Sequence, residues 1–314
     1  MVALEFLFFF VISGFLITSL LLRELGADGQ IRLGRFYVRR AFRIFPPLYA
    51  YLTVVGILGL ARVTAVDWRS FLSAATYTWN YYIHGQGWVF GHLGSLSLEE
   101  QFYLLWPHCL VLFNKRICLR IATAAVFLSP VSRIATYLLF PDLRGHTGMM
   151  LHTSVDTIMI GCVLALVIHM NLWTEFLRRV TRIYVILAAV VFPLFLNSLL
   201  TVRFRGTYSL TVGMSLQGIC CGVVLLYAIT HPDNALGKSL NHPLVRHVGI
   251  ISYSLYLWQQ LFSLDGMFSS FLWQTVSLFA CAEASYFVIE KPSSRLRDKV
   301  LALVADRKMT IVST

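Results

Sequence analysis

Charged residues are scarce in this 314-residue chain, because only 13% of its residues are Asp, Glu, Lys or Arg while 57% are hydrophobic. Soluble domains carry roughly 25% charged residues. Segments without any charge, such as 183–202 and 206–230, reach the length of about 20 residues that crosses a bilayer as a helix. This composition excludes an ordinary soluble protein and predicts an all-α, polytopic integral membrane protein.

Cysteine motifs are absent as well. The sequence has six cysteines but no CxxC pair and no Cys/His spacing typical of metal ligands. We therefore predict buried packing thiols, with no disulfide framework and no metal site. The net charge of +11 is confined to particular connecting segments, so it does not indicate binding to nucleic acid.

Long apolar segments recur along the whole chain, with no low-complexity linker and no soluble domain between them. We expect one membrane domain over residues 1–314, with about nine transmembrane helices. The predicted spans are 4–22, 45–61, 98–113, 117–140, 152–170, 183–202, 206–230, 248–264 and 267–289.

Basic residues alternate between the connecting segments. Twenty of the 26 Lys and Arg lie in 23–44, 114–120, 171–182, 231–247 and the tail after 290. The other segments, 62–97, 141–151, 201–205 and 265–266, carry at most five. Positive loops are cytoplasmic in most membrane proteins. This pattern predicts a cytoplasmic C-terminus and, with nine spans, an N-terminus outside.

The first apolar span begins at residue 4, without a basic leader segment or a cleavage site, so it does not read as a signal peptide. A chain that starts outside at once predicts that one preceding helix is missing. A genuine protein with its N-terminus outside is the alternative.

A basic cluster is the clearest candidate site. Arg39, Arg40 and Arg43 are three and four residues apart, so they share one face of a helix. Guanidinium groups bind phosphate oxygens in bidentate fashion, which favours a phosphate-rich ligand. Simple anchoring to anionic lipid, at ~1 kcal/mol per cation, is the alternative. Pro46 and Pro47 are expected to end this stretch or to begin the next helix.

Two adjacent carboxylates, Glu99 and Glu100, open the third span. Ionisable groups in a span are costly and usually face a cavity with a function. Glu100 has a simpler explanation, because Ser97 and Glu100 fit a capping box at a helix start. Glu99 lies four residues before Tyr103, on the same face, and is a candidate general base or a group that orients a histidine.

Two further polar groups are candidates for binding a polar acceptor. His152 precedes Asp156 by one helical turn, so the two could pair and bind substrate, or simply satisfy each other. Tyr256 and Gln259 belong to an aromatic and amide segment that could bind sugar, with helix packing as the alternative. Glu283 is expected to have a partner that the sequence does not identify.

Six segments, taken in order, resemble the membrane acyltransferase-3 family of bacterial enzymes that decorate cell-surface sugars. They are FFFVISGFLIT (8–18), FYVRRAFRIFPPLY (36–49), SLSLEEQFYLLWP (95–107), HTSVDTIMIGC (152–162), ISYSLYLWQQLF (251–262) and SYFVIEKP (285–292). Each segment is weak alone, but together they cover nearly the whole chain.

The resemblance implies transfer of an acyl group, often acetyl, from acyl-CoA to a hydroxyl of a carbohydrate or lipid-linked glycan. It implies no bound cofactor, with acyl-CoA as co-substrate, contact with membrane lipids, and a place in a bacterial inner membrane. Arg40 and Arg43 match the family's RxxR pair for the acyl-CoA donor, to which we add Arg39. Glu99 and Glu100 match the family's carboxylates.

The chain departs from the family at its start. Members normally begin with another helix that carries the presumed catalytic histidine, and this sequence starts just after that position. His92 is the one nearby histidine that we nominate as a substitute. Leu93-Gly94 and Gln259-Gln260 replace residues that are common in the family. The rival hypothesis is a catalytically defective member that acts as a membrane scaffold or transporter.

Overall fold

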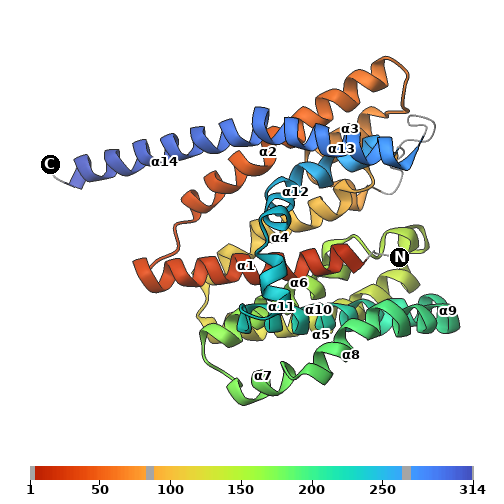
Figure 1. The fold of residues 1–314 in the computed structure, drawn as a ribbon, viewed down its shortest axis with the longest axis vertical. Helices are drawn as coiled ribbons and strands as arrows, with labels where there is room; N and C mark the ends of the chain where they lie inside the picture. The colour runs from red at the N-terminus through yellow and green to blue at the C-terminus, as the bar shows by residue number, and fades with distance from the viewer. Residues whose placement is uncertain (1–3, 83–87, 264–269, 313–314) are drawn as a thin grey trace. The chain divides into compact units, whose positions relative to one another are not determined.

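The computed structural model describes residues 4–82, 88–263 and 270–312, and its regular secondary structure in these ranges is entirely helical. The chain forms two compact units, each built from two separate stretches of sequence (Figure 1). One unit takes the described residues within 1–31 and 95–240, and the other takes those within 32–94 and 241–314. The prediction of one domain over 1–314 stays a prediction.

The first unit is a bundle of long helices joined by short helical turns. Its elements are α1 (Leu4–Asp28), most of α4 (Leu93–Leu112), α5 (Lys115–Leu139), η3 (Pro141–His146), α6 (Leu151–His169), α7 (Thr174–Val180), α8 (Ile183–Val191), η4 (Phe192–Leu196), α9 (Asn197–Tyr208), η5 (Ser209–Gly213), α10 (Met214–Thr230) and α11 (Ala235–Leu240).

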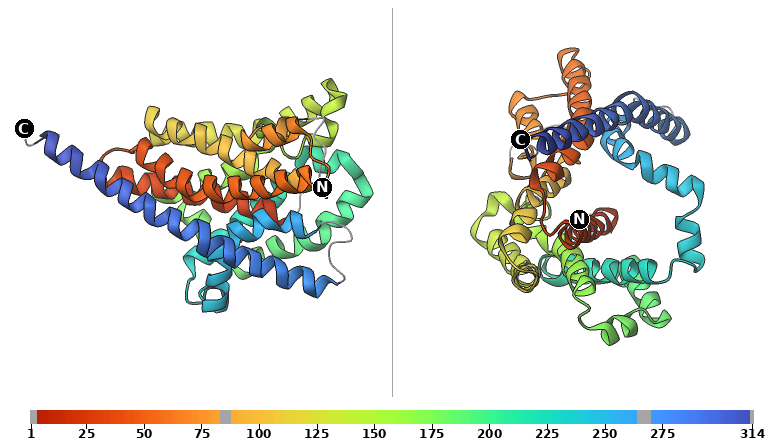
Figure 2. Two further views of the ribbon diagram at one scale, coloured as in Figure 1. Left: turned by 90° about the horizontal axis from the view of Figure 1, so that it is seen from above. Right: turned by 90° about the vertical axis from the view of Figure 1, so that its left-hand side faces the viewer.

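The second unit is smaller and is assembled around one long helix. Its elements are α2 (Leu33–Leu60), α3 (Trp68–Ala75), η1 (Trp79–Tyr81), η2 (Trp88–Phe90), α12 (Pro243–Phe262), α13 (Phe271–Ser285), η6 (Tyr286–Glu290) and α14 (Lys291–Val312). α13, η6 and α14 follow one another as a nearly continuous helix (Figure 2). α2 packs against α12, η6 and α14.

Two glycines allow α1 and α6 to pack very closely in the first unit. A Cβ atom built on Gly14 would lie 2.0 Å from the carbonyl oxygen of Ile158. A Cβ atom built on Gly161 would lie 2.1 Å from the carbonyl oxygen of Val11. Small residues are typical of helix contacts in membranes, where backbones approach without a hydrophobic driving force.

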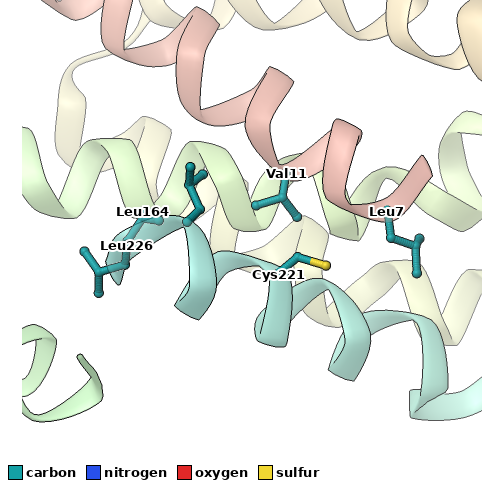
Figure 3. Packing of buried hydrophobic residues seen from close by; sticks show 6 residues of the cluster. Leu7, Val11, Leu164, Cys221 and Leu226 are labelled. Carbon is teal, nitrogen blue, oxygen red and sulfur yellow. The ribbon is translucent and has the colours of Figure 1, made fainter. Parts of the chain in front are cut away.

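An apolar cluster joins α10 to this helix pair. Leu7 and Val11 of α1 pack with Leu164 of α6 and with Cys221 and Leu226 of α10 (Figure 3). The buried position of Cys221 agrees with the predicted role of the thiols in packing. All six cysteines are free thiols.

The interpretation of Pro46 and Pro47 as a helix boundary is wrong. α2 runs through both prolines from Leu33 to Leu60, so the basic cluster and the following apolar span form a single helix. A proline inside a helix frees a backbone carbonyl, and neighbouring helices in a membrane can compensate. The hydroxyl of Tyr253 on α12 donates to the carbonyl of Ile44, 3.0 Å away, and so links α12 to α2 just before the prolines.

Helices occupy the positions of all nine predicted spans, within the residues that the structure describes. Seven of them are long and apolar enough to cross a membrane. α4 and α12 coincide with the third and eighth predicted spans but are not among these seven. The chain is thus a polytopic helical membrane protein, while the count of about nine and the cytoplasmic C-terminus stay predictions.

The predicted loop at 201–205 is wrong, because these residues are helical and belong to α9. The segment contains no Pro or Gly that would end a helix there. π-Helical turns flank α9 on both sides, η4 before it and η5 after it, and such turns bend helices without breaking them. The predicted loop at 265–266 lies outside the described residues.

The close approach of α1 and α6 makes a specific prediction about stability. Gly14→Ala should destabilise the protein by roughly 1–3 kcal/mol, because its methyl group would overlap the carbonyl of Ile158. Gly26→Ala in the same helix meets no atom within 4 Å and should stabilise by roughly 0.4–1 kcal/mol. Unfolding of both variants in detergent measures the difference, and equal stabilities would contradict the packing.

Candidate active site

A buried carboxylate on α4 lies at the centre of a hydrogen-bonded cluster in the first unit. Glu99 is only 4% exposed. The hydroxyls of Ser13 and Tyr103 both lie within hydrogen-bonding distance of its Oε1 atom and of each other, so their two protons are shared among three contacts. The prediction that Glu99 and Tyr103 share a helix face is confirmed. The arrangement fixes one oxygen of Glu99 between two donors.

α4 is held against α1 over two helical turns. Besides the contact between Ser13 and Glu99, the indole Nε1 of Trp106 donates to the hydroxyl of Thr18, 2.8 Å away. Trp106 lies seven residues after Glu99, so both side chains point from the same face of α4 toward α1. This second contact fixes the rotation of α4 and therefore the direction in which Glu99 points.

The predicted capping box at Ser97 and Glu100 is wrong. α4 begins at Leu93, so Ser97 lies inside the helix and is fully buried rather than at its end. The buried η2 turn and Leu93 extend the helix by one turn toward the N-terminus. Glu100 is half-buried and points about 100° away from Glu99 around the helix. Its role as a catalytic residue stays a prediction.

A buried ion pair joins α5 to α6. The guanidinium of Arg133 lies 2.8 Å from Oδ2 of Asp156, and both side chains are at most 1% exposed. The hydroxyls of Ser129 and Ser215 donate to the same carboxylate. Arg133 also donates to the backbone carbonyl of Thr153 at 2.8 Å. A charged pair in an apolar bundle is stable only with such complete hydrogen bonding.

The predicted pairing of His152 with Asp156 is wrong, because Asp156 pairs with Arg133. The spacing of four allows the pairing, but His152 is exposed at the start of α6 where Asp156 is fully buried and bonded to α5. The Nε2 atom of His152 instead lies 3.1 Å from the hydroxyl of Thr136. Of the two alternatives for Asp156, its satisfied and buried state favours structure over acceptor binding.

The basic cluster lies on α2 in the second unit. Arg39 and Arg40 are half-buried and Arg43 is exposed. Arg43 lies close enough to Glu290 in η6 to interact with it electrostatically. Glu290 itself is buried and accepts a hydrogen bond from Ser254 on α12. Two of the segments that resemble the family, 36–49 and 285–292, therefore meet around Arg43.

His92 is enclosed by aromatic rings in the second unit. Its ring centre lies 5.4 Å from that of Tyr51 and 5.4 Å from that of Tyr256, both edge-on. Tyr51 is in turn 5.4 Å from Trp258. Burial lowers the pKa of His92 to about 3, against an opposing hydrogen bond with the backbone of Leu257. His92 is therefore neutral at neutral pH, and its role as a substitute base stays a prediction.

Tyr256 and Gln259, the two residues on α12 that were predicted to bind the acceptor, differ in their surroundings. The hydroxyl of Tyr256 donates to the backbone carbonyl of His92, so this side chain holds the aromatic group together. Gln259 is half-buried near the end of α12. The structure therefore favours packing for Tyr256, and acceptor binding by Gln259 stays a prediction.

Three important polar residues were not among the predicted site residues. Ser13 could have been suspected as a hydroxyl within the apolar span 4–22, and Arg133 as a cation inside a span that requires a carboxylate. The partner of Glu283, which the sequence left open, is His247 on α12. No sequence spacing connects these pairs, because their partners come from other helices.

Comparison with known proteins gives a family match over most of the chain. The family model described as an acyltransferase domain of the acyltransferase-3 type matches residues 8–288. A comparison with solved structures finds no match.

Curated relatives are O-acetyltransferases by name. The peptidoglycan O-acetyltransferase OatA of Listeria monocytogenes is 29% identical over 80% of this chain and 43% of its own length. The putative peptidoglycan O-acetyltransferase YrhL of Bacillus subtilis is 29% identical over 90% of this chain and 49% of its own. A putative O-acetyltransferase of Staphylococcus aureus is 28% identical, with coverages of 90% and 51%. The chain spans about half the length of these relatives.

The buried ion pair should be essential for stability. Asp156→Asn leaves the Arg133 guanidinium buried without a countercharge and should cost about 3–5 kcal/mol. Replacing the pair by Arg133→Met with Asp156→Leu should recover most of this loss, because no charge then stays buried. Unfolding in detergent measures both.

The control is Glu175→Gln, which removes an ion pair whose side chains are 71% and 79% exposed and should change stability by less than about 0.5 kcal/mol. A loss for Asp156→Asn no larger than that of the control would contradict the structural role of the pair.

Proposed function

Because the chain belongs to the membrane acyltransferase-3 family, we propose that it transfers an acetyl group from acetyl-CoA to a hydroxyl of a cell-envelope glycan. The names of the relatives support acetyl as the group and peptidoglycan as the class of acceptor. The predicted cytoplasmic position of the basic segments supports a donor that enters from the cytoplasm, and thus an inner-membrane location.

The observation that carries this proposal is the buried cluster around Glu99, which lies in the SLSLEEQFY segment of the family match. A carboxylate held in a dry environment by two hydroxyl donors is positioned to move a proton. Its partner Ser13 comes from another matched segment, so two separate motifs build one group.

The reaction needs one proton acceptor and one leaving group. The acceptor hydroxyl loses its proton to a base, and its oxygen attacks the carbonyl carbon of the thioester. A new C–O bond forms, the C–S bond breaks, and coenzyme A leaves as a thiolate that then takes up a proton. We assign proton removal to Glu99, because its buried carboxylate is held by Ser13 and Tyr103 in a matched segment of the family.

Donor binding falls to the guanidinium groups of α2. Arg39, Arg40 and Arg43 face the phosphate groups of coenzyme A in this proposal, and bidentate bonds to phosphate are among the strongest that proteins form. Glu290 beside Arg43 limits how far that side chain can turn away. His152, exposed at the start of α6, and Gln259 are assigned to the acceptor.

Removing two donor cations should weaken acetyl-CoA binding. Arg40→Ala with Arg43→Ala deletes charge-assisted hydrogen bonds worth ~1.5–3 kcal/mol each, so we expect a loss in affinity of roughly 10²–10⁴-fold. Calorimetry of the purified chain in nanodiscs measures this. The exposed pair Arg178→Ala with Arg179→Ala is the control and should bind normally. Unchanged affinity of the first variant would remove the proposed role of the arginines.

Loss of the Glu99 carboxylate should act on catalysis and not on donor binding. Glu99→Gln keeps the size of the side chain but removes its basicity, so kcat should fall by ~10²–10⁴-fold with the acetyl-CoA affinity retained. The measurement is release of coenzyme A in the presence of peptidoglycan fragments, with Glu175→Gln as the control. Full activity of Glu99→Gln would exclude Glu99 as the base.

A further inference from the structure

The first unit contains a cavity of about 470 Å³ at the junction of α1, α5 and α6. It lies away from the Glu99 cluster along the chain, at the turn between α4 and α5 and at the end of α6. Its lining residues are Leu25, Phe113, Asn114, Lys115, Arg116 and Met170. This lining combines two cations, one amide and three apolar side chains, with no carboxylate.

The two cations stand where the helix itself is already positive. Lys115 and Arg116 begin α5, and no acidic residue lies in its first turn. The first N–H groups of a helix have no partner within it and give its start a partial positive charge. Asn114 caps one of these groups, the N–H of Ile117, at 3.0 Å. Cations at this end oppose the helix dipole, and a bound anion would relieve that.

A neutral histidine holds one of these two cations in place. The Nζ atom of Lys115 lies 3.0 Å from Nε2 of His169, the last residue of α6. An ammonium group can only donate, so Nε2 accepts and His169 is neutral in this contact. The contact holds Lys115 across the junction from α5 to α6 and thereby fixes its position beside the cavity.

Exposed apolar side chains flank the lining residues of the cavity in sequence. Leu112, next to the lining residue Phe113, is 71% exposed, and Phe113 itself is 43% exposed. Ile117, one turn inside α5, is 37% exposed. A small soluble anion would gain no binding free energy from apolar side chains. A lipid would, because it carries acyl chains as well as a phosphate. Basic pockets between transmembrane helices bind anionic lipid headgroups in other membrane proteins.

We propose that this cavity binds the phosphate headgroup of an anionic phospholipid. Lys115 and Arg116 contact the phosphate, and the acyl chains lie along Phe113 and the exposed apolar side chains beside it. The bound lipid neutralises the start of α5 and ties α1, α5 and α6 together. This site is independent of the proposed acetyl transfer and of the arginines on α2.

The test uses the full chain, purified in a neutral detergent and titrated with phosphatidylglycerol, with binding read by native mass spectrometry. Phosphatidylcholine is the neutral lipid, and inorganic phosphate is the soluble competitor. Lys115→Gln with Arg116→Gln should weaken phosphatidylglycerol binding by roughly 10–30-fold, from two cations near the lipid phosphate. Arg178→Gln with Arg179→Gln has the same change in net charge outside the cavity and should bind within about twofold of the wild type.

Three results would overturn the proposal: equal affinity for phosphatidylcholine, unchanged binding by the cavity variant, or equal losses in both variants. Displacement of the lipid by inorganic phosphate at millimolar concentration would also overturn it, because it would show a site for a soluble phosphate. If the double variant does not fold, phosphatidylglycerol binding is measured with Arg116→Gln alone, because Arg116 is exposed and its replacement should leave folding intact. Acetyl transfer activity plays no part in these outcomes, so failure here leaves the proposed function untouched.

Discussion

The first unit depends on the close packing of α1 on α6, with Gly14 against the carbonyl of Ile158 and Gly161 against the carbonyl of Val11. At these two points the backbones come so close that no side chain fits between them. The contact determines which way α1 faces, and the residue beside Gly14 is Ser13, whose hydroxyl reaches Glu99. The packing of α1 against α6 thus positions a hydrogen-bond donor on α1 for a carboxylate on a third helix, α4. Without that approach, α1 could rotate or withdraw and Glu99 would lose one of its two hydrogen-bond donors.

The buried polar side chains around Glu99 and Asp156 form hydrogen bonds or ion pairs with side chains on other helices. Arg133 and Asp156 form an ion pair completed by two serines, and the Oε1 atom of Glu99 lies within hydrogen-bonding distance of the hydroxyls of Ser13 and Tyr103. Asp156 is fully buried and its carboxylate is bonded by a guanidinium and two hydroxyls, so we assign it a structural role. Chemistry at Glu99 stays our proposal.

Sequence reasoning predicted what depends on composition and local spacing. The membrane-spanning helices follow from the apolar runs, and the shared face of Glu99 and Tyr103 follows from their spacing of four. Sequence reasoning was wrong where the conformation of a side chain depends on a partner from another helix. Asp156 bonds Arg133, 23 residues earlier, rather than His152 in its own helix. α2 continues through Pro46 and Pro47 because helices in a bundle tolerate proline, which a local rule cannot foresee.

The charge balance of the chain points beyond the chain itself. Its 26 Lys and Arg face only 15 Asp and Glu, an excess of 11 positive charges. Asp156 is paired with the buried Arg133, and Glu290 lies near Arg43. These two carboxylates therefore already have cationic neighbours. Lys115 and Arg116 at the start of α5 have no acidic residue in their helical turn. Cations at the ends of apolar helices attract anions from their surroundings. In our proposals these anions are different for two helices, because α5 binds a lipid headgroup and α2 binds the phosphate groups of the acyl donor.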